Sequence, residues 1–283
     1  MKYRFLFLFL LFACLLAACG SASNDFADDL KPAKLIQTVD HEVEVDHGGH
    51  GHDHSILREF VGSGSPKLSV EVTADSATGV NVHVTSDLQV APFAASSHHV
   101  DGEGHYHLLV DGVKVLRFYN EWIHYSDLAP GDHTVGVELA ANDHSVYAWD
   151  GKKVSAETAI TLKESTAHHH HSGAFVEFVG ASPTLDIEVI EDKKSGWNVY
   201  VELAGMVIDP TMGDDNHVDG VGHLHLYVNG EKAARLYGTA THIESLPHGE
   251  VEVMVALYNN LHKPYVRNGD TLSASALVVN SGN

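Results

Sequence analysis

Histidines that recur at constant spacing are the residues of this sequence best suited to chemistry. A fourteen-residue phrase occurs twice, 118 positions apart, with ten of its fourteen residues identical. The same offset relates two further histidine pairs, so five histidines per copy stay in register. They are His99, His105, His107, His124 and His144 in the first copy, and His217, His223, His225, His242 and His262 in the second.

The pair His105 and His107 has the spacing of a chelate on a β-strand. Alternate side chains of a strand point to opposite faces, so both imidazoles project to one side. Tyr106, Leu108 and Val110 then project to the other side, where they can pack in a core. Imidazole nitrogens bind Zn²⁺ at about 2.0–2.1 Å, and two rings two residues apart can converge on one ion.

We therefore predict one metal site per copy, built from the registered histidines. His124 and His144 follow segments with a strand-like pattern and would complete the first site, as His242 and His262 would complete the second. Asp101 and its counterpart Asp219 lie beside the first histidine of each copy. The alternative is that these histidines are structural and form hydrogen bonds in turns and at strand ends.

The type of ion follows from the available ligands. The sequence has two cysteines, Cys14 and Cys19, and both lie in the N-terminal leader, so thiolate ligands and internal disulfides are not expected. Imidazole with optional carboxylate favours Zn²⁺ or Cu²⁺, and Ni²⁺ and Co²⁺ remain possible.

Two further histidine tracts have the composition of auxiliary metal-binding segments. The first lies among carboxylates and glycines, where a solvated spacer is the alternative, and the second separates the two copies. Their histidines are His41, His47, His50, His52 and His54, and then His168, His169, His170 and His171.

The N-terminus predicts a lipoprotein leader. Lys2 and Arg4 precede an apolar run, and the sequence Leu-Ala-Ala-Cys that ends at Cys19 is typical of a bacterial lipobox. Residues 1–19 would be the signal peptide, and Cys19 would carry the lipid, including palmitate. This places the chain in the bacterial cell envelope, with the outer membrane, on its periplasmic or surface face, favoured over the inner membrane.

The charge balance limits the possible partners. With 38 acidic against 17 basic side chains and a formal charge of -21, binding to nucleic acid is disfavoured. An acidic protein suits transition-metal ions, and a metal transporter or metal chaperone is the partner that we would expect besides the membrane.

The remaining pattern predicts an all-β protein. Short alternating segments over 68–72, 80–84, 105–110, 113–118, 134–139 and 156–162 are punctuated by Gly, Pro, Asn and Asp, which is typical of antiparallel strands. We expect an acidic linker over 20–55, a β-sandwich repeat over 56–164, a linker over 165–173 and a second repeat over 174–283. Each repeat would be an immunoglobulin-like or cupredoxin-like sandwich.

Each repeat also resembles a family of small, histidine-rich secreted bacterial domains of unknown function. In the first repeat the resemblance is carried by Val90-Ala-Pro92, Gly104-His-Tyr-His-Leu-Leu-Val-Asp111, Pro130-Gly-Asp-His-Thr134 and Asp143-His144. It implies a β-sandwich and no particular activity. The second repeat lacks the Pro-Gly order and the Asp-His pair.

Three functions are compatible with these patterns. The leading hypothesis is a lipid-anchored protein that captures, buffers or delivers Zn²⁺ or Cu²⁺, and that binds them less well below about pH 6 as the imidazoles protonate. A histidine-metal enzyme, such as a zinc hydrolase or hydratase or a copper dismutase, is the second. A tandem-sandwich adhesion or assembly module with structural histidines is the third.

Overall fold

The protein is built from short antiparallel strands. The computed structural model describes residues 56–62, 64–76, 78–164, 174–211 and 217–282. Among these residues there is no α-helix, and one short 3-10 segment, η1 (Pro92–Ala94), interrupts the strands. The all-β fold expected from the alternation is therefore confirmed, and all six predicted strand segments are strands.

The strands of the two repeats correspond in order. The first repeat contains β1 (Leu57–Glu59), β2 (Leu68–Ala74), β3 (Val80–Ser86), β4 (Gln89–Val90), β5 (Glu103–Val110), β6 (Val113–Phe118), β7 (Trp122–Tyr125), β8 (Gly131–Ala141), β9 (Val146–Trp149), β10 (Lys152–Lys153) and β11 (Ser155–Leu162). The second contains β12 (Val176–Glu177), β13 (Thr184–Glu191), β14 (Trp197–Ala204), β15 (Val207–Ile208), β16 (Val221–Val228), β17 (Glu231–Leu236), β18 (Ala240–Ile243), β19 (Gly249–Asn259), β20 (Tyr265–Arg267), β21 (Asp270–Thr271) and β22 (Ser273–Asn280).

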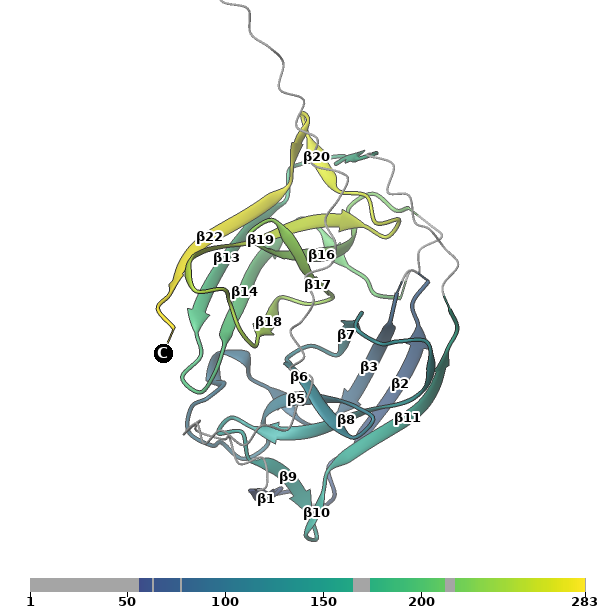
Figure 1. The fold of residues 1–283 in the computed structure, drawn as a ribbon, viewed down its shortest axis with the longest axis vertical. Coiled ribbons are helices and arrows are strands. Elements are labelled where there is room, and N and C mark those ends of the chain that lie inside the picture. Colours follow the sequence, from purple (N-terminus) through teal and green to yellow (C-terminus); the bar gives the residue numbers. More distant parts are fainter. Residues whose placement is uncertain (1–55, 63, 77, 165–173, 212–216, 283) are drawn as a thin grey trace, which may run out of the picture.

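Each repeat packs two sheets around a hydrophobic core of its own (Figure 1). In the first repeat, β2, β3 and β7 form one sheet, and β6, β5, β8 and β11 pair in this order in the other. Val82 of the first sheet and Leu108 and Val137 of the second are fully buried in one cluster. The second repeat has the matching order β17, β16, β19 and β22 opposite β13, β14 and β18.

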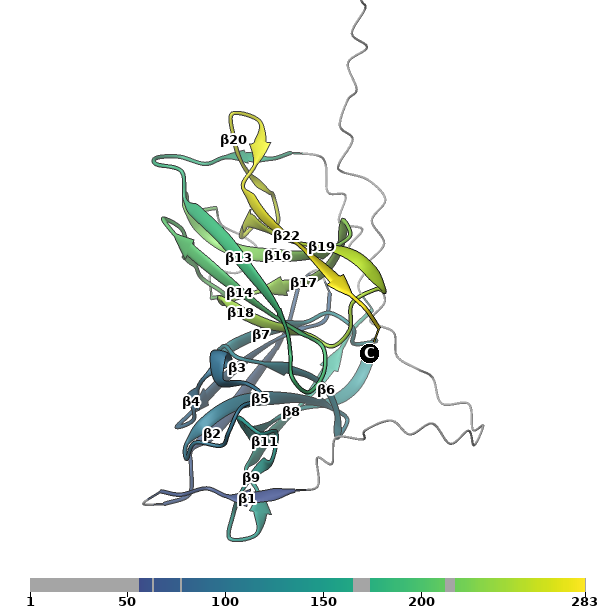
Figure 2. The same cartoon turned by 90° about the vertical axis from the view of Figure 1, so that its left-hand side faces the viewer.

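The two repeats meet through equivalent strands. The offset of 118 converts β6 into β17 and β7 into β18. Strand β6 pairs with β18 at Phe118 and Thr241, and β17 lies against β7, which gives the interface an approximate twofold symmetry. Figure 2 shows these four strands at the middle of the molecule, between the blue-teal first repeat and the green-yellow second repeat. The interface matters because the histidine clusters lie beside it.

Candidate metal centres

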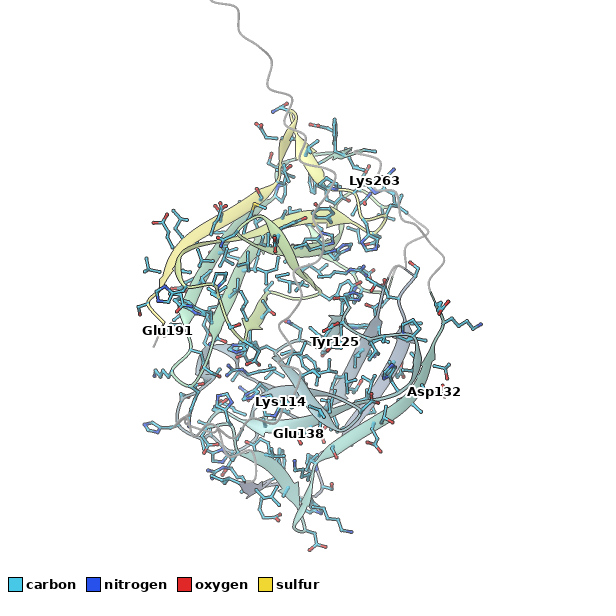
Figure 3. The ribbon with its side chains drawn as sticks, viewed as in Figure 1. Lys114, Tyr125, Asp132, Glu138, Glu191 and Lys263 are labelled. Atoms are coloured by element: carbon cyan, nitrogen blue, oxygen red, sulfur yellow. The ribbon has the colours of Figure 1, made fainter. Side chains whose placement is uncertain are left out.

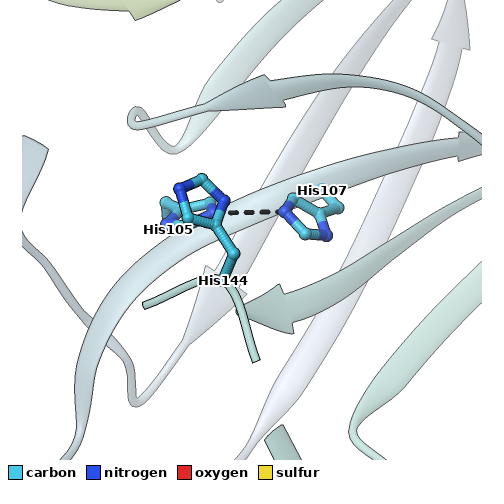
Figure 4. Close-up of side chains that lie close together, drawn as sticks. All are labelled: His105, His107 and His144. Carbon is cyan, nitrogen blue, oxygen red and sulfur yellow. Dashed lines mark hydrogen bonds between the residues drawn. The ribbon is translucent and has the colours of Figure 1, made fainter. Parts of the chain in front are cut away.

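Three histidines of the first repeat form a compact cluster, the first triad (Figure 4). His105 and His107 come from β5, and His144 comes from the turn that follows β8. One ring nitrogen from each lies within 4.8 Å of the other two, and the Nε2 atoms of His105 and His107 are 3.1 Å apart. His105 and His107 are buried, and His144 is partly exposed.

Strand geometry brings the triad together. On β5, Leu108 points into the core of the repeat while His105 and His107 occupy the opposite face, as predicted. Strand β8 runs antiparallel to β5 with Ala140 opposite His105, so the turn that follows Ala141 returns over the pair. His144 donates its backbone N–H to Ala141 O at 2.9 Å within this turn.

The turn histidine has an uncommon backbone conformation in both repeats. His144 has φ 70° and its counterpart His262 has φ 58°, in the left-handed region that residues with a Cβ rarely adopt. Such a conformation costs roughly 1–2 kcal/mol. Because both repeats maintain it at the histidine, the position of this side chain is under a structural or functional constraint.

The second triad repeats the arrangement. His223 and His225 on β16 and His262 after β19 bring three ring nitrogens within 4.8 Å of one another. The Nε2 atoms of His223 and His225 are 2.9 Å apart. The His225 ring stacks on Tyr258 with a centroid distance of 3.8 Å.

A carboxylate orients one ligand of the first triad but has no equivalent in the second. Glu138 Oε1 accepts a hydrogen bond from His107 Nδ1 at 3.1 Å, so the Nε2 atom of that ring faces the cluster. Burial would raise the pKa of Glu138, but the hydrogen bond from His107 holds it below its usual value. Figure 3 labels Glu138 in the first repeat, close to Lys114. Ala256 takes its place opposite His225.

Burial favours the neutral form of four triad imidazoles. Burial lowers the pKa of His105, His223 and His225 well below the usual value, and neighbouring positive groups lower it further. Burial, with the Arg117 charge, lowers the pKa of His144 to about 3. Neutral rings keep the lone pairs that a metal ion needs.

These two triads could each hold a metal ion. Ligand nitrogens of a tetrahedral site lie about 3.3 Å apart at a bond length of about 2.05 Å, close to the spacing of each Nε2 pair. His105 Nδ1 and His225 Nδ1 are buried and have no hydrogen-bond partner among the described residues. Each triad thus offers three imidazoles and leaves a fourth coordination position for a further ligand.

His124 and His242 do not lie where the sequence predicted. We expected His124 in the site of its own repeat, but it lies across the interface beside Asp75 and Arg235, where the second triad is. His242 contacts Arg117 of the first repeat at 2.8 Å. The four histidines expected to form one site within each repeat are therefore three, and the fourth lies beside the triad of the other repeat. Strands β7 and β18 face the other repeat's cluster because they form the interface.

An arginine connects the first triad to the second repeat. Arg117 Nη1 donates to His144 Nε2 at 3.1 Å and to Asp192 Oδ2 at 3.2 Å, and both members of this ion pair are buried. Asn198 Nδ2 donates to Asp192 at 2.8 Å. Burial opposes ionisation of Asp192, but a hydrogen bond from Ser96 and the Arg117 charge hold its pKa well below the usual range.

The second triad has the equivalent connection, related to the first by the approximate twofold symmetry. Arg235 Nη1 donates to Asp75 Oδ2 at 2.6 Å, and Asn81 Nδ2 donates to the same oxygen at 3.0 Å. His124 Nδ1 lies 2.9 Å from Asn81 Oδ1. Burial opposes ionisation of Asp75, but the Arg235 charge keeps its pKa well below the usual range. Each triad is thus flanked by its own repeat's arginine and by an Asp-Asn-His group of the other repeat.

The recurring histidines alone did not point to these arginines and aspartates, although the sequence carries a signal for them. Arg117 and Arg235 are 118 positions apart, in the register of the histidines, and Asp75 and Asp192 are 117 apart, one residue off that register. Lys114 and Lys232 also recur at 118. Glu138 has no such signal, because its counterpart is Ala256.

The other predicted ligands lie outside the triads. His99 and His217 each contact the neighbouring aspartate of the repeated phrase, Asp101 at 2.7 Å and Asp219 at 2.8 Å. They are not members of either cluster. Outside the described residues lie Cys19 and the auxiliary histidines, His41, His47, His50, His52 and His54 with His168, His169, His170 and His171.

Comparisons with known proteins assign no family to this chain. No family model matches the chain, and no curated protein matches it. Among solved structures, the chain is similar to the fibronectin(III)-like modules of Clostridium thermocellum CbhA, with 10% identity, a TM-score of 0.23 and coverage of 77% of this chain and 95% of that one. The central fibronectin-III array of RIM-binding protein has 15% identity, a TM-score of 0.23 and coverage of 77% and 69%. In the described part of the chain, no helix is long and apolar enough to span a membrane.

Proposed function

We propose that this protein binds transition-metal ions, Zn²⁺ or Cu²⁺, at one histidine triad per repeat, and that it captures, buffers or delivers them. The observation that carries the proposal is the pair of equivalent triads. In each, two strand histidines and one left-handed turn histidine bring three ring nitrogens within 4.8 Å of one another.

The chemistry of the donors supports a borderline metal ion. Three imidazoles without thiolate suit Zn²⁺ and Cu²⁺ better than the oxygen-seeking ions Ca²⁺ or Mg²⁺. The Glu138–His107 hydrogen bond is the carboxylate–histidine arrangement that supports metal ligands in many proteins.

Titration calorimetry of the full chain with Zn²⁺ and with Cu²⁺ tests the proposal. We expect two equivalents that require the triads. Replacing His105 and His107 together by alanine should remove one, and replacing His223 and His225 should remove the other. Weaker binding that persists in both variants would belong to the histidine tracts. If saturable binding were absent, or were unchanged in both variants, the proposal would be wrong.

The setting of this activity is a second part of the proposal. A lipid on Cys19 would anchor the chain in the cell envelope, and the histidine tracts over 41–54 and 168–171 would collect ions near the triads, for exchange with a transporter or chaperone. Labelling with a palmitate analogue tests the anchor. The label should be lost in Cys19→Ser and retained in Cys14→Ser.

A further inference from the structure

The two triads have different electrostatic surroundings. Around the first, Glu103, Glu138 and Glu244 accompany the lysine and arginine of β6. At the positions 118 residues later or earlier, the second site has Val221, Ala256 and Ser126. All three carboxylates are thus replaced by uncharged residues.

Two basic residues, Arg235 and Lys232, remain at the second site. Arg235 is buried, and Lys232 is half-buried beside it. Asp75 forms an ion pair with Arg235, and a second carboxylate, Asp209, lines the adjoining cavity. A divalent ion at the triad would add two further positive charges, which a low-dielectric site tolerates poorly without an anion.

Two buried hydrogen-bond donors at the second site lack acceptors in the described part of the chain. Asn260 Nδ2 and Arg235 Nε are buried and have no hydrogen-bond partner among the described residues. The asparagine at the matching position of the first repeat, Asn142, donates its Nδ2 to Glu103 at 3.2 Å. Asn260 lacks this acceptor because Val221 replaces Glu103. Buried donors without acceptors are costly, and in native proteins they commonly indicate a bound group.

A cavity lies beside these donors. It has a volume of about 370 Å³, at the lower end of the ~300–1,000 Å³ range of small-molecule sites. Its wall includes residues of both repeats, among them Asp75, Trp122, Asp209, His223, Tyr237 and Asn260. Arg235 contacts two of them, Asp75 and Tyr237. At the first site, Ser96 Oγ lies 2.7 Å from His144 Nε2 and donates to Asp192. The matching position of the second repeat, 214, lies outside the described residues.

We propose that the second triad, together with this cavity, binds a small oxyanion as the fourth ligand of its metal ion, whereas the first triad does not. The inference rests on the proposed metal binding. An oxyanion of the phosphate, carbonate or carboxylate type would bind the metal through one oxygen and accept hydrogen bonds from Asn260 and Arg235 through the others. The second repeat would then be a ternary site for metal and anion, and the first a metal site alone.

Cobalt spectroscopy with inorganic phosphate as the probe tests this directly. Co²⁺ reports its coordination in the visible spectrum. The full chain with His105→Ala and His107→Ala retains the second site, and the chain with His223→Ala and His225→Ala retains the first. Phosphate, added at constant ionic strength against chloride, should change the Co²⁺ spectrum saturably in the former variant and leave it unchanged in the latter. In the unaltered chain, it should change about half of the absorption.

Matched asparagine variants locate the anion. Asn260→Ala should weaken phosphate binding about tenfold or more, the cost of one hydrogen bond to a charged group, while Co²⁺ still binds. Asn142→Ala, its counterpart at the first site, should have no effect on phosphate binding. Val221→Glu, which restores the carboxylate found beside Asn142, should also abolish phosphate binding.

The outcomes separate this inference from the proposed function. If two Co²⁺ ions bind but phosphate leaves their spectra unchanged, the oxyanion site is wrong and metal binding still stands. The same holds if phosphate changes the spectra of both sites equally. Retained phosphate binding in both Asn260→Ala and Val221→Glu would also overturn it. A chain that binds no Co²⁺ would remove both proposals. Circular dichroism of each variant verifies that the β-fold is maintained.

Discussion

Single imidazoles differ in what holds them in place. His107 lies between the Nε2 of His105 and the carboxylate of Glu138, so one nitrogen is oriented by an anion and the other faces the cluster. His225 has no carboxylate partner and rests on the ring of Tyr258 instead. Equivalent histidines in the two repeats should therefore bind metal with different affinities.

Removing one strand histidine should remove one site. His107→Ala should lower the number of Zn²⁺ ions bound per chain from two to one in calorimetry, because two remaining imidazoles hold the ion much more weakly. His133→Ala is the control. His133 hydrogen-bonds with Asp111 at the surface, away from both triads, so its removal should leave both sites intact. Equal losses in the two variants would contradict the triad.

Removing the orienting carboxylate should weaken the first site without destroying it. Glu138→Gln should lower Zn²⁺ affinity there about 10–100-fold, the usual effect of losing such a partner. The measurement uses the chain with His223→Ala and His225→Ala, so that one site is observed. Glu157→Gln, an exposed residue of the same repeat, provides the comparison and should change nothing.

The strands of the interface make each site dependent on both repeats. β6 supplies Arg117 to the first triad, and the second repeat supplies Asp192 and His242 to hold it. At the second triad, β17 supplies Arg235 and β7 supplies His124 in the symmetry-related arrangement. A substitution in one repeat should therefore alter the metal site of the other.

Asp192→Asn tests this crossed dependence. It leaves the buried Arg117 guanidinium without its ion-pair partner, which should lower the free energy of unfolding by about 3–5 kcal/mol in urea denaturation. Metal affinity should fall at the first triad, whose histidines belong to the other repeat, more than at the second. Asp186→Asn, on the exposed side of β13, is the matched control. An effect limited to the second triad would contradict the crossed arrangement.

The whole molecule contains many buried, neutral histidines, and this sets its response to acid. Burial lowers the pKa of six histidines, two of them, His124 and His144, to about 3. Among the described residues these histidines are His105, His124, His144, His223, His225 and His242. The unfolded chain would bind protons at these residues near pH 6.5, while the folded chain would not.

The metal-free protein should therefore lose stability as the pH falls below about 6.5. The unfolded state binds more protons between the two pKa values, so each such histidine lowers the free energy of unfolding by up to about 1.4 kcal/mol per pH unit. Urea denaturation with a chelator at pH 7 and pH 5.5 measures the difference. The His105→Ala, His107→Ala variant should show a shallower dependence. Equal stability at both pH values would refute this expectation.

Metal binding should act in the opposite direction and stabilise the folded chain. Free Zn²⁺ at 100 times its dissociation constant adds about 2.7 kcal/mol per site, so the melting temperature should rise on loading and fall after EDTA. A chain in which all six triad histidines are alanine should melt at the same temperature with and without Zn²⁺.

The sequence by itself determined the strands, the paired faces of His105 and His107, and the register between the two repeats. These depend on local alternation and on repetition, both of which are readable along one chain. Only the tertiary structure decided that His124 and His242 serve the opposite repeat, that Arg117 and Arg235 border the triads, and that Glu138 supports only one of them. Such assignments depend on how β6 and β7 pack against β17 and β18, because the repeat offset shows which residues recur but not which contacts they make across the interface.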